Sequence, residues 1–267
     1  KKILLLLKKE GKTLIISEHR LYYLQGLADE FWLMKNGSLY EKYEQNKFTA
    51  FSQSELHDLC LRVTDLKQIQ VQDRPLKRGS DKLEVRNLSF GYKQQKILKD
   101  VSFTASLGEV NCFIGKNACG KTTLGKCISG LLKSHYGSIL LNGEKMSYKQ
   151  LAQKSLFIMQ EAEFQFFTNS VLSELRYGVN PSKYGEIEPL LKRFNLWEQR
   201  NRHPFSLSGG QMQKLTLIMA YLSDKRAIVL DEPTSGLDKK SLDTIVELIK
   251  DMKQQKIVIV ISHPHTW

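Results

Sequence analysis

One run of the sequence has the residue types and the spacing that phosphate binding requires. From Gly115 the chain reads GKNACGKT, which fits the pattern G-x-x-x-x-G-K-[ST]. In such a loop the backbone N–H groups and the positive end of the following helix hold phosphates. Lys121 would reach the β- and γ-phosphates, and the hydroxyl of Thr122 would bind Mg²⁺. The apolar run VNCFI before the loop and the helical pattern TTLGKCISGLL after it supply the required strand–loop–helix context, so we predict a nucleotide site here.

Two acidic residues follow another apolar run. The stretch AIVLDE places Asp231 at the end of a predicted strand and Glu232 directly after it. Asp231 would hold Mg²⁺, directly or through water, and Glu232 would polarise the attacking water. A strand that simply ends in a turn would give the same letters, but the phosphate-binding loop upstream favours the catalytic interpretation.

A second glycine-containing helix start lies between these two motifs. Leu207 begins the run LSGGQ, which leads into the apolar-periodic segment MQKLTLIMAYL. A helix that starts with Ser208 and two glycines offers N–H groups to an anion. By itself the run also fits an ordinary serine-capped helix. Together with the first loop, it gives the chain two predicted phosphate-binding devices.

The elements that must position these motifs alternate in type along the second part of the chain. Four short apolar runs are typical of parallel strands buried on both faces: VNCFIG, SLFIMQ, AIVLDE and IVIVISH. Helical segments separate them, and the stretches LEVRNLSFGY and ILKDVSFTA alternate like an antiparallel meander. We therefore predict an α/β domain.

The start of the chain repeats a pattern found at its end. The runs KTLIIS and IVIVIS each follow a Lys-rich helical stretch, and each precedes a histidine, His19 or His263. We interpret this as an internal repeat, which means two copies of one domain. After His19, RLYYLQGLA predicts a short helix, and EFWLMKNGSLYEKY predicts two strands around a turn at Asn36-Gly37.

The repeat and a polar stretch divide the chain. DRPLKRGSD has the Pro, Gly and Ser content of a linker. The predicted organisation is the end of a first copy at residues 1–50, a linker at 51–80 and a second copy at 81–267 that stops just after His263. Because the chain begins without Met and stops directly after an apolar run, we interpret it as a fragment or a trimmed chain.

Composition excludes several classes of protein. Hydrophobic residues make up 41% and charged residues 25%, which rules out a long disordered or low-complexity chain. No apolar stretch approaches the ~18 residues of a membrane-spanning helix. The net charge of +12 is spread along the chain, so no basic nucleic-acid-binding tail is predicted. The charge is compatible with an anionic partner. The four cysteines lack metal-type spacing and fit a reduced compartment.

Cys119 lies inside the phosphate-binding loop, two residues before Lys121. The loop N–H groups, the lysine charge and the helix start would make its thiol reactive. An inert small residue that fits the turn is the alternative. Cys112, on a predicted buried strand, should be shielded, and Cys127, on the following helix, should be less activated.

Residues 82–267 resemble the nucleotide-binding domain of ATP-binding cassette (ABC) proteins. The LSGGQ run followed by LDEPTSGLD at Leu230 to Asp238 is highly specific to that family. The resemblance implies a P-loop NTPase fold with a mixed core sheet, an antiparallel β subdomain and a helical subdomain. It also implies hydrolysis of ATP with Mg²⁺, with ATP held between the P-loop of one cassette and the LSGGQ run of another.

The resemblance assigns further roles residue by residue. Tyr92 would stack on adenine, and Gln160 would contact Mg²⁺ and water and sense a membrane partner. His263 would contact the γ-phosphate, and His19 matches the same histidine of the preceding copy. The predicted catalytic residues are Glu232, His263 and Gln160, and the predicted metal ligands are Thr122, Gln160 and Asp231. The predicted nucleotide contacts are Tyr92, Gly115, Asn117, Gly120, Lys121, Thr122, Thr123, Ser208, Gly209, Gly210, Gln211 and Asp238.

The chain departs from the family pattern at a few positions. Pro264 follows His263 where an Asp is usual, which puts the backbone setting of the histidine in doubt. Cys119 replaces a small residue of the loop, and Met159-Gln160-Glu161 differs from the common FQN run, although the glutamine is retained.

The stretches ISEHRLYYL, ADEFWLMKNGSL and EAEFQFFTNSVLSELRYG resemble the tandem ATPases of energy-coupling-factor (ECF) vitamin and metal importers. This implies a second cassette and transmembrane subunits as partners, and a place on the inner face of the membrane. The rival is a soluble tandem ABC-F-type ATPase on ribosomes, but the predicted linker lacks that type's sustained charged helix. A catalytically silent scaffold is a third interpretation, against which the intact site residues argue.

Overall fold

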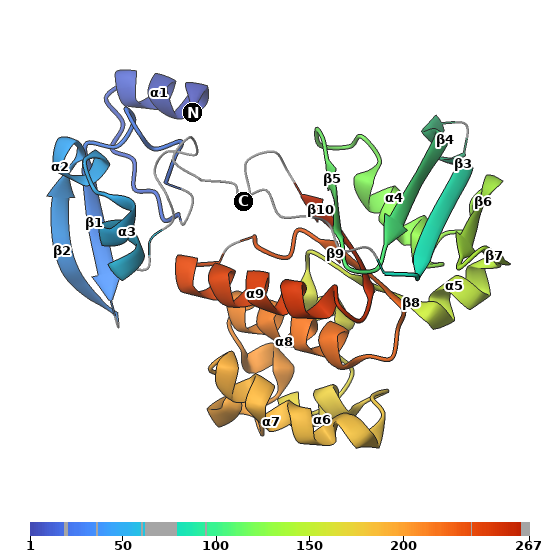
Figure 1. The fold of residues 1–267 in the computed structure, drawn as a ribbon. Helices are drawn as coiled ribbons and strands as arrows, with labels where there is room; N and C mark the ends of the chain where they lie inside the picture. Colours follow the sequence, from blue (N-terminus) through green and yellow to red (C-terminus); the bar gives the residue numbers. More distant parts are fainter. Residues whose placement is uncertain are drawn as a thin grey trace. The chain divides into compact units, whose positions relative to one another are not determined.

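The computed structural model describes residues 1–18, 21–35, 37–59, 61, 79–93, 95–235 and 237–262. The chain divides into two units (Figure 1). The predicted organisation as two cassettes joined by a linker stays an interpretation. Among the described residues, no helix combines the length and the apolar character that crossing a bilayer would need.

A parallel sheet forms the centre of the larger unit. Its strands are β5 (Val110–Ile114), β8 (Ser155–Ile158), β9 (Ala227–Asp231) and β10 (Ile257–Ser262), in the order β5-β10-β9-β8. Every residue of β9 and β10 is buried, as their continuous apolar runs predict. In the middle of the sheet Val260 pairs with Leu230 on one side and with Cys112 on the other. The four predicted strands are therefore confirmed as parallel neighbours.

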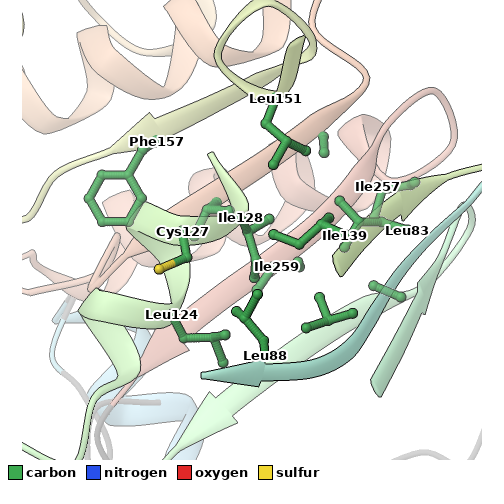
Figure 2. Packing of buried hydrophobic residues seen from close by; sticks show 14 of the residues in the cluster. Leu83, Leu88, Leu124, Cys127, Ile128, Ile139, Leu151, Phe157, Ile257 and Ile259 are labelled. Atoms are coloured by element: carbon green, nitrogen blue, oxygen red, sulfur yellow. The ribbon is translucent and has the colours of Figure 1, made fainter. Parts of the chain in front are cut away.

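A second, antiparallel sheet covers one side of this centre. It contains β3 (Lys82–Tyr92), β4 (Gln95–Ser106), β6 (Tyr136–Leu141) and β7 (Glu144–Met146), in the order β4-β3-β6-β7. Helix α4 (Lys121–Ile128) packs between the two sheets. Figure 2 shows Leu124, Cys127 and Ile128 of α4 in one apolar cluster with residues of both sheets. This cluster fixes the helix that follows the P-loop.

Helices form the remainder of the larger unit. They are α5 (Tyr148–Lys154), α6 (Val171–Arg176), α7 (Tyr184–Arg193), α8 (Gly209–Leu222) and, from Asp243 onward, α9 (Lys239–Met252). Helix α6 packs against both α7 and α8, and α8 also contacts β8 (Figure 1). With its parallel sheet, antiparallel sheet and helical group, the unit confirms the predicted α/β fold class.

Strand β5 differs from the prediction of a strand buried on both faces. Its residues alternate between exposed and half-buried, and Ile114 is 59% exposed. The physical reason is its place at the edge of the described sheet, where β10 is its one neighbour. Cys112 is consequently exposed, so the expectation that it is shielded is wrong.

The smaller unit has an aromatic and aliphatic core of its own. Helices α1 (Lys2–Lys9), α2 (Gln45–Thr49) and α3 (Gln53–Asp58) accompany the antiparallel pair β1 (Glu30–Lys35) and β2 (Ser38–Glu44). The rings of Phe31 and Phe48 stack with their centroids 4.0 Å apart. Leu56, from the predicted linker, is buried in the same core. The predicted hairpin is confirmed, although Asn36 of its turn lies outside the described residues.

The smaller unit differs from its sequence patterns at two places. The apolar run at residues 12–17 has a composition like that of β10 but forms no strand, because no described strand pairs with it, and Ile15 is 96% exposed. Residues 22–27 form successive turns instead of the predicted helix. Gly26 has a φ of 66°, a left-handed conformation that a right-handed helix cannot continue through.

Candidate functional site

Three groups of predicted site residues follow the carboxyl ends of parallel strands. The P-loop follows β5, Gln160 lies just after β8, and Glu232 directly follows β9. Open α/β sheets bind ligands at this edge. The third predicted catalytic residue, His263, follows β10, and both it and His19 lie outside the described residues.

The P-loop is shaped by its own backbone. Ala118 and Gly120 have φ values of 60° and 100°, the left-handed region that turns successive N–H groups toward one centre. Lys121 Nζ donates to the carbonyl oxygens of Gly115 and Lys116 at 2.8 and 2.9 Å, so the loop curls around its lysine. A side chain at Gly120 would lie 3.0 Å from Leu98 Cδ2. Glycine is therefore favoured there by the backbone conformation, and a larger residue would also require Leu98 to shift.

The hydroxyl of Thr122 donates to Asp231 Oδ2 at 2.8 Å, although the two residues lie 109 positions apart. Burial raises the pKa of the Asp231 carboxyl, while the Thr122 hydrogen bond and the charges of two lysines oppose that rise. These two oxygens are the donor type that Mg²⁺ prefers, and Mg²⁺ in proteins usually takes one or two such ligands beside phosphates and water. The residues present fit the predicted ion.

Glu232 occupies an unusual backbone conformation. Its φ is 49°, which costs a residue with a side chain roughly 1–3 kcal/mol. Its N–H donates to the carbonyl of Ile261 on β10 at 3.0 Å. Its carbonyl accepts from Gln213 Nε2 at 3.0 Å and from the N–H of Ser235 at 3.2 Å. Such conformations persist where the surroundings over-determine them, and they cluster at functional sites.

The LSGGQ run begins α8 in a regular way. Ser208 and Gln211 form a reciprocal capping box, in which the N–H of Ser208 donates to Gln211 Oε1 at 2.9 Å. From Leu207 to Gln211 no residue has a positive φ, and a side chain at Gly209 would meet nothing within 4 Å. This loop is a helix N-terminus with its glycine face open.

Three further predicted residues have mixed surroundings. Tyr92 ends β3, is 49% exposed and contacts Phe90 edge-on with ring centroids 4.9 Å apart. Gln160 is exposed. Asp238 Oδ1 accepts from the N–H of Ser241 at 2.7 Å, so this carboxylate caps the start of α9. The roles of all three in nucleotide binding stay predictions.

The structure adds three polar residues that sequence patterns did not single out. Gln213, on α8, is 8% exposed and reaches the backbone of Glu232. Gln165 accepts from the N–H of Met159 at 2.9 Å and donates to the carbonyl of Phe157 at 2.8 Å. Buried Glu174 accepts from the N–H of Thr168 at 2.8 Å and from that of Phe167 at 3.0 Å. The sequence could have pointed to these residues only as polar side chains that lie among apolar neighbours.

A protein-family model described as "ABC transporter" matches residues 98–235 of the chain. A protein of Treponema denticola, named as an ABC transporter ATP-binding protein, is 34% identical over 264 residues, which are 96% of this chain and 54% of that protein. The chain spans about half the length of the curated relatives it matches first.

Two other similar proteins have more specific names. A Bacillus subtilis protein named as the HMP/thiamine import ATP-binding protein YkoD is 34% identical over 199 residues, 72% of this chain and 36% of that protein. The solved structure of cbiO1 from Clostridium perfringens, described as part of the ABC transporter complex cbiONQ, has a TM-score of 0.58 and 26% identity. It covers 68% of this chain and 78% of its own.

Proposed function

Because the chain belongs to the ABC transporter family of ATPases, we propose that it hydrolyses ATP to power an importer of the ECF type. The observation that carries this proposal is the convergence of Lys121, the Thr122–Asp231 pair and Glu232 at one edge of the parallel sheet. The importer subtype draws on the names of the HMP/thiamine-import relative and of the component of the cbiONQ transporter complex.

Each of these residues has a separate task in hydrolysis. Lys121, now turned onto its own loop, would exchange those two carbonyls for the β- and γ-phosphate oxygens. Thr122 and Asp231 would hold Mg²⁺, whose chemistry is to neutralise phosphate charge. Glu232 would accept a proton from the attacking water as the bond to the γ-phosphate forms. Ser208 and the glycines of α8 would contact ATP bound by another cassette.

An exposed aromatic surface supports a protein partner. Phe164 is 69% exposed and Phe167 is 77% exposed, on the segment that follows Gln160. Gln165 and Glu174 hold this segment through partly buried hydrogen bonds, so the rings are presented from a fixed backbone. Exposed apolar patches of sufficient size mark protein interaction sites, and two exposed phenylalanines on one segment are candidates for such a patch. We assign this surface to a transmembrane transporter subunit, which would hold the chain at the inner face of the membrane.

The catalytic part of the proposal is tested by Glu232→Gln in the intact protein. We expect ATP affinity to be retained and turnover to fall roughly 10²–10⁴-fold, since the general base is lost. Fluorescent-ATP titration and phosphate release measure the two quantities. Turnover within twofold of the wild type would exclude Glu232 as the base.

The partner is tested by a Phe164→Ser/Phe167→Ser double variant. We expect basal ATP hydrolysis to be unchanged, while co-purification with ECF-type transmembrane subunits and transport in vesicles are lost. Normal transport by this variant would contradict the docking surface and leave the ATPase proposal intact.

The ABC-F-type alternative is less well supported, because the relatives reported above are named as transporter components. Its distinguishing property is ribosome binding. Co-sedimentation with ribosomes that survives physiological salt would favour the alternative, since non-specific binding of a chain with net charge +12 fades steeply as salt rises.

A further inference from the structure

Gln213 connects helix α8 to the backbone of Glu232. It lies in the second turn of α8, five residues after the N-cap Ser208. Its Nε2 donates to the Glu232 carbonyl oxygen at 3.0 Å, across 19 positions of sequence. The helix that starts with the LSGGQ run is thereby joined to the residue that follows β9.

The surroundings of Gln213 make this hydrogen bond specific. Its side chain is 8% exposed, and Leu215, Leu217 and Ile218 of the same helix are fully buried. An amide in such a place must find hydrogen-bond partners, because an unpaired buried donor is costly. Filling the space alone would need only an apolar side chain of similar length.

The partner of Gln213 needs support. Glu232 is held at a φ of 49°, its N–H is fixed to Ile261 on β10, and the N–H of Ser235 also contacts its carbonyl. A left-handed residue with a side chain keeps its conformation only where several contacts impose it. Of these two donors to the Glu232 carbonyl, Gln213 is the one that belongs to a helix. Its hydrogen bond fixes the orientation of that peptide group, and the orientation of the peptide group affects where the Glu232 side chain points.

We propose that Gln213 is a positioning residue, which holds the backbone of Glu232 so that its carboxylate meets the attacking water. The inference rests on the proposed function, in which Glu232 is the general base. The role is one of positioning, because the contact that Gln213 makes is with the backbone of Glu232.

The loss of this contact has a predictable effect. Without the amide donor, the Glu232 carbonyl retains the N–H of Ser235, so the fold survives and the peptide group shifts slightly. A displacement of about 1 Å in a catalytic group can cost a factor of 10² in rate. We therefore expect Gln213→Met, which keeps length but removes the donor, to lower kcat roughly 10–100-fold. The KM and Kd for ATP should stay within about threefold, because the nucleotide contacts are untouched.

A matched control exists on the same helix. The buried hydroxyl of Thr216 donates to the Gln213 carbonyl oxygen at 2.9 Å, within α8. Thr216→Val therefore removes one buried side-chain hydrogen bond from α8 without disturbing the contact to Glu232. Gln213→Glu adds a second probe of the donor, since an ionised carboxylate has the same shape but cannot donate. Thermal unfolding of all variants separates loss of stability from loss of rate.

A double-mutant cycle with Glu232→Gln decides whether Gln213 positions the base or only contributes to the packing of the fold. If Gln213 acts through the base, Gln213→Met lowers kcat in the wild-type background and causes no further fall beyond twofold in the Glu232→Gln background. An equal fall in both backgrounds, or a kcat of Gln213→Met within twofold of that of Thr216→Val, would overturn the inference while Glu232 remains the base. Full turnover of Glu232→Gln itself would instead overturn the proposed function and the inference together.

Discussion

The P-loop and the LSGGQ loop both place glycines at a helix N-terminus, yet the chain builds them by different means. The P-loop contains left-handed residues at Ala118 and Gly120, and it closes around Lys121. The LSGGQ loop has no positive φ and closes with an ordinary capping box between Ser208 and Gln211. One loop is preformed by its own contacts, and the other is a regular helix start.

This difference separates two reasons for a glycine. At Gly120 the fold itself favours glycine, because a residue with a side chain would be strained at a φ of 100° and its Cβ would press on Leu98. At Gly209 the fold makes no such demand, because the space around it is open. Under the proposed function, the reason for a glycine at 209 would be ATP held by another cassette.

The largest expected effect concerns the charge in the P-loop. Lys121→Ala should lower turnover roughly 10²–10³-fold, because a fixed positive group aimed at developing phosphate charge is lost. Lys116→Ala is the control, since it removes the same charge from an exposed position of the same loop. Phosphate release measures both. Equal losses in the two variants would mean that general positive charge matters, and not the position that Lys121 occupies.

The next effect is on stability. Gly120→Ala should lower the free energy of unfolding by roughly 1–3 kcal/mol, because alanine is strained at a φ of 100°. Gly143→Ala is the control for strain alone, since Gly143 has a φ of 83° and open space around it. If Gly120→Ala loses more unfolding free energy than Gly143→Ala, the difference measures the cost of pushing against Leu98 and Ile97. Denaturant unfolding that gives the same loss at both positions would show that the neighbouring side chains yield.

The opposite behaviour is expected at Gly209. Gly209→Ala should leave the stability unchanged or raise it by up to about 1 kcal/mol, since alanine is the better helix former. ATP turnover should nevertheless fall by about tenfold, because a methyl group would stand where the nucleotide approaches. Gly185→Ala, in the first turn of α7 with similarly open space, should gain stability and keep full activity. Full activity of Gly209→Ala would remove the reason to place a nucleotide at this loop.

Sequence patterns predicted what depends on local order. Continuous apolar runs identified β9 and β10, and the GxxxxGK[ST] spacing identified the loop before α4. Thr122 and Asp231 were predicted separately as Mg²⁺ ligands, and the structure joins them by a hydrogen bond that the sequence patterns did not predict. The strand and loop predictions succeeded because each strand and helix carries its own pattern.

What the patterns missed depends on neighbours that are distant in sequence. The exposure of Cys112 follows from the edge position of β5, which no letter of VNCFI records. The run at residues 12–17 has strand-like composition but no described strand beside it. The hydrogen bond from Gln213 to Glu232 joins a helix to a strand end, and a polar residue in an apolar-periodic helix does not name its partner.

The smallest expected effect concerns the thiol inside the P-loop. Cys119 is exposed, and its sulfur lies 4.0 Å from Lys121 Nζ, on the side of the loop that faces Gly115. A maleimide attached there would stand against the phosphates, so labelling should block ATP hydrolysis and Mg-ATP should slow the labelling. Cys127 should stay unlabelled, because it is buried and burial raises its pKa to about 11, which leaves little thiolate at neutral pH.

Cys112 must be removed before this labelling is measured, because it is also exposed. In a Cys112→Ser background, mass spectrometry of labelled peptides with and without Mg-ATP should show selective protection of Cys119. Cys119→Ala should hydrolyse ATP normally, since a small side chain still fits the turn, and should resist inhibition by the maleimide. Slow labelling of Cys119 that ATP leaves unchanged would favour the inert alternative. In that case Cys119 would be a small residue that fits the turn of the P-loop and has no special reactivity.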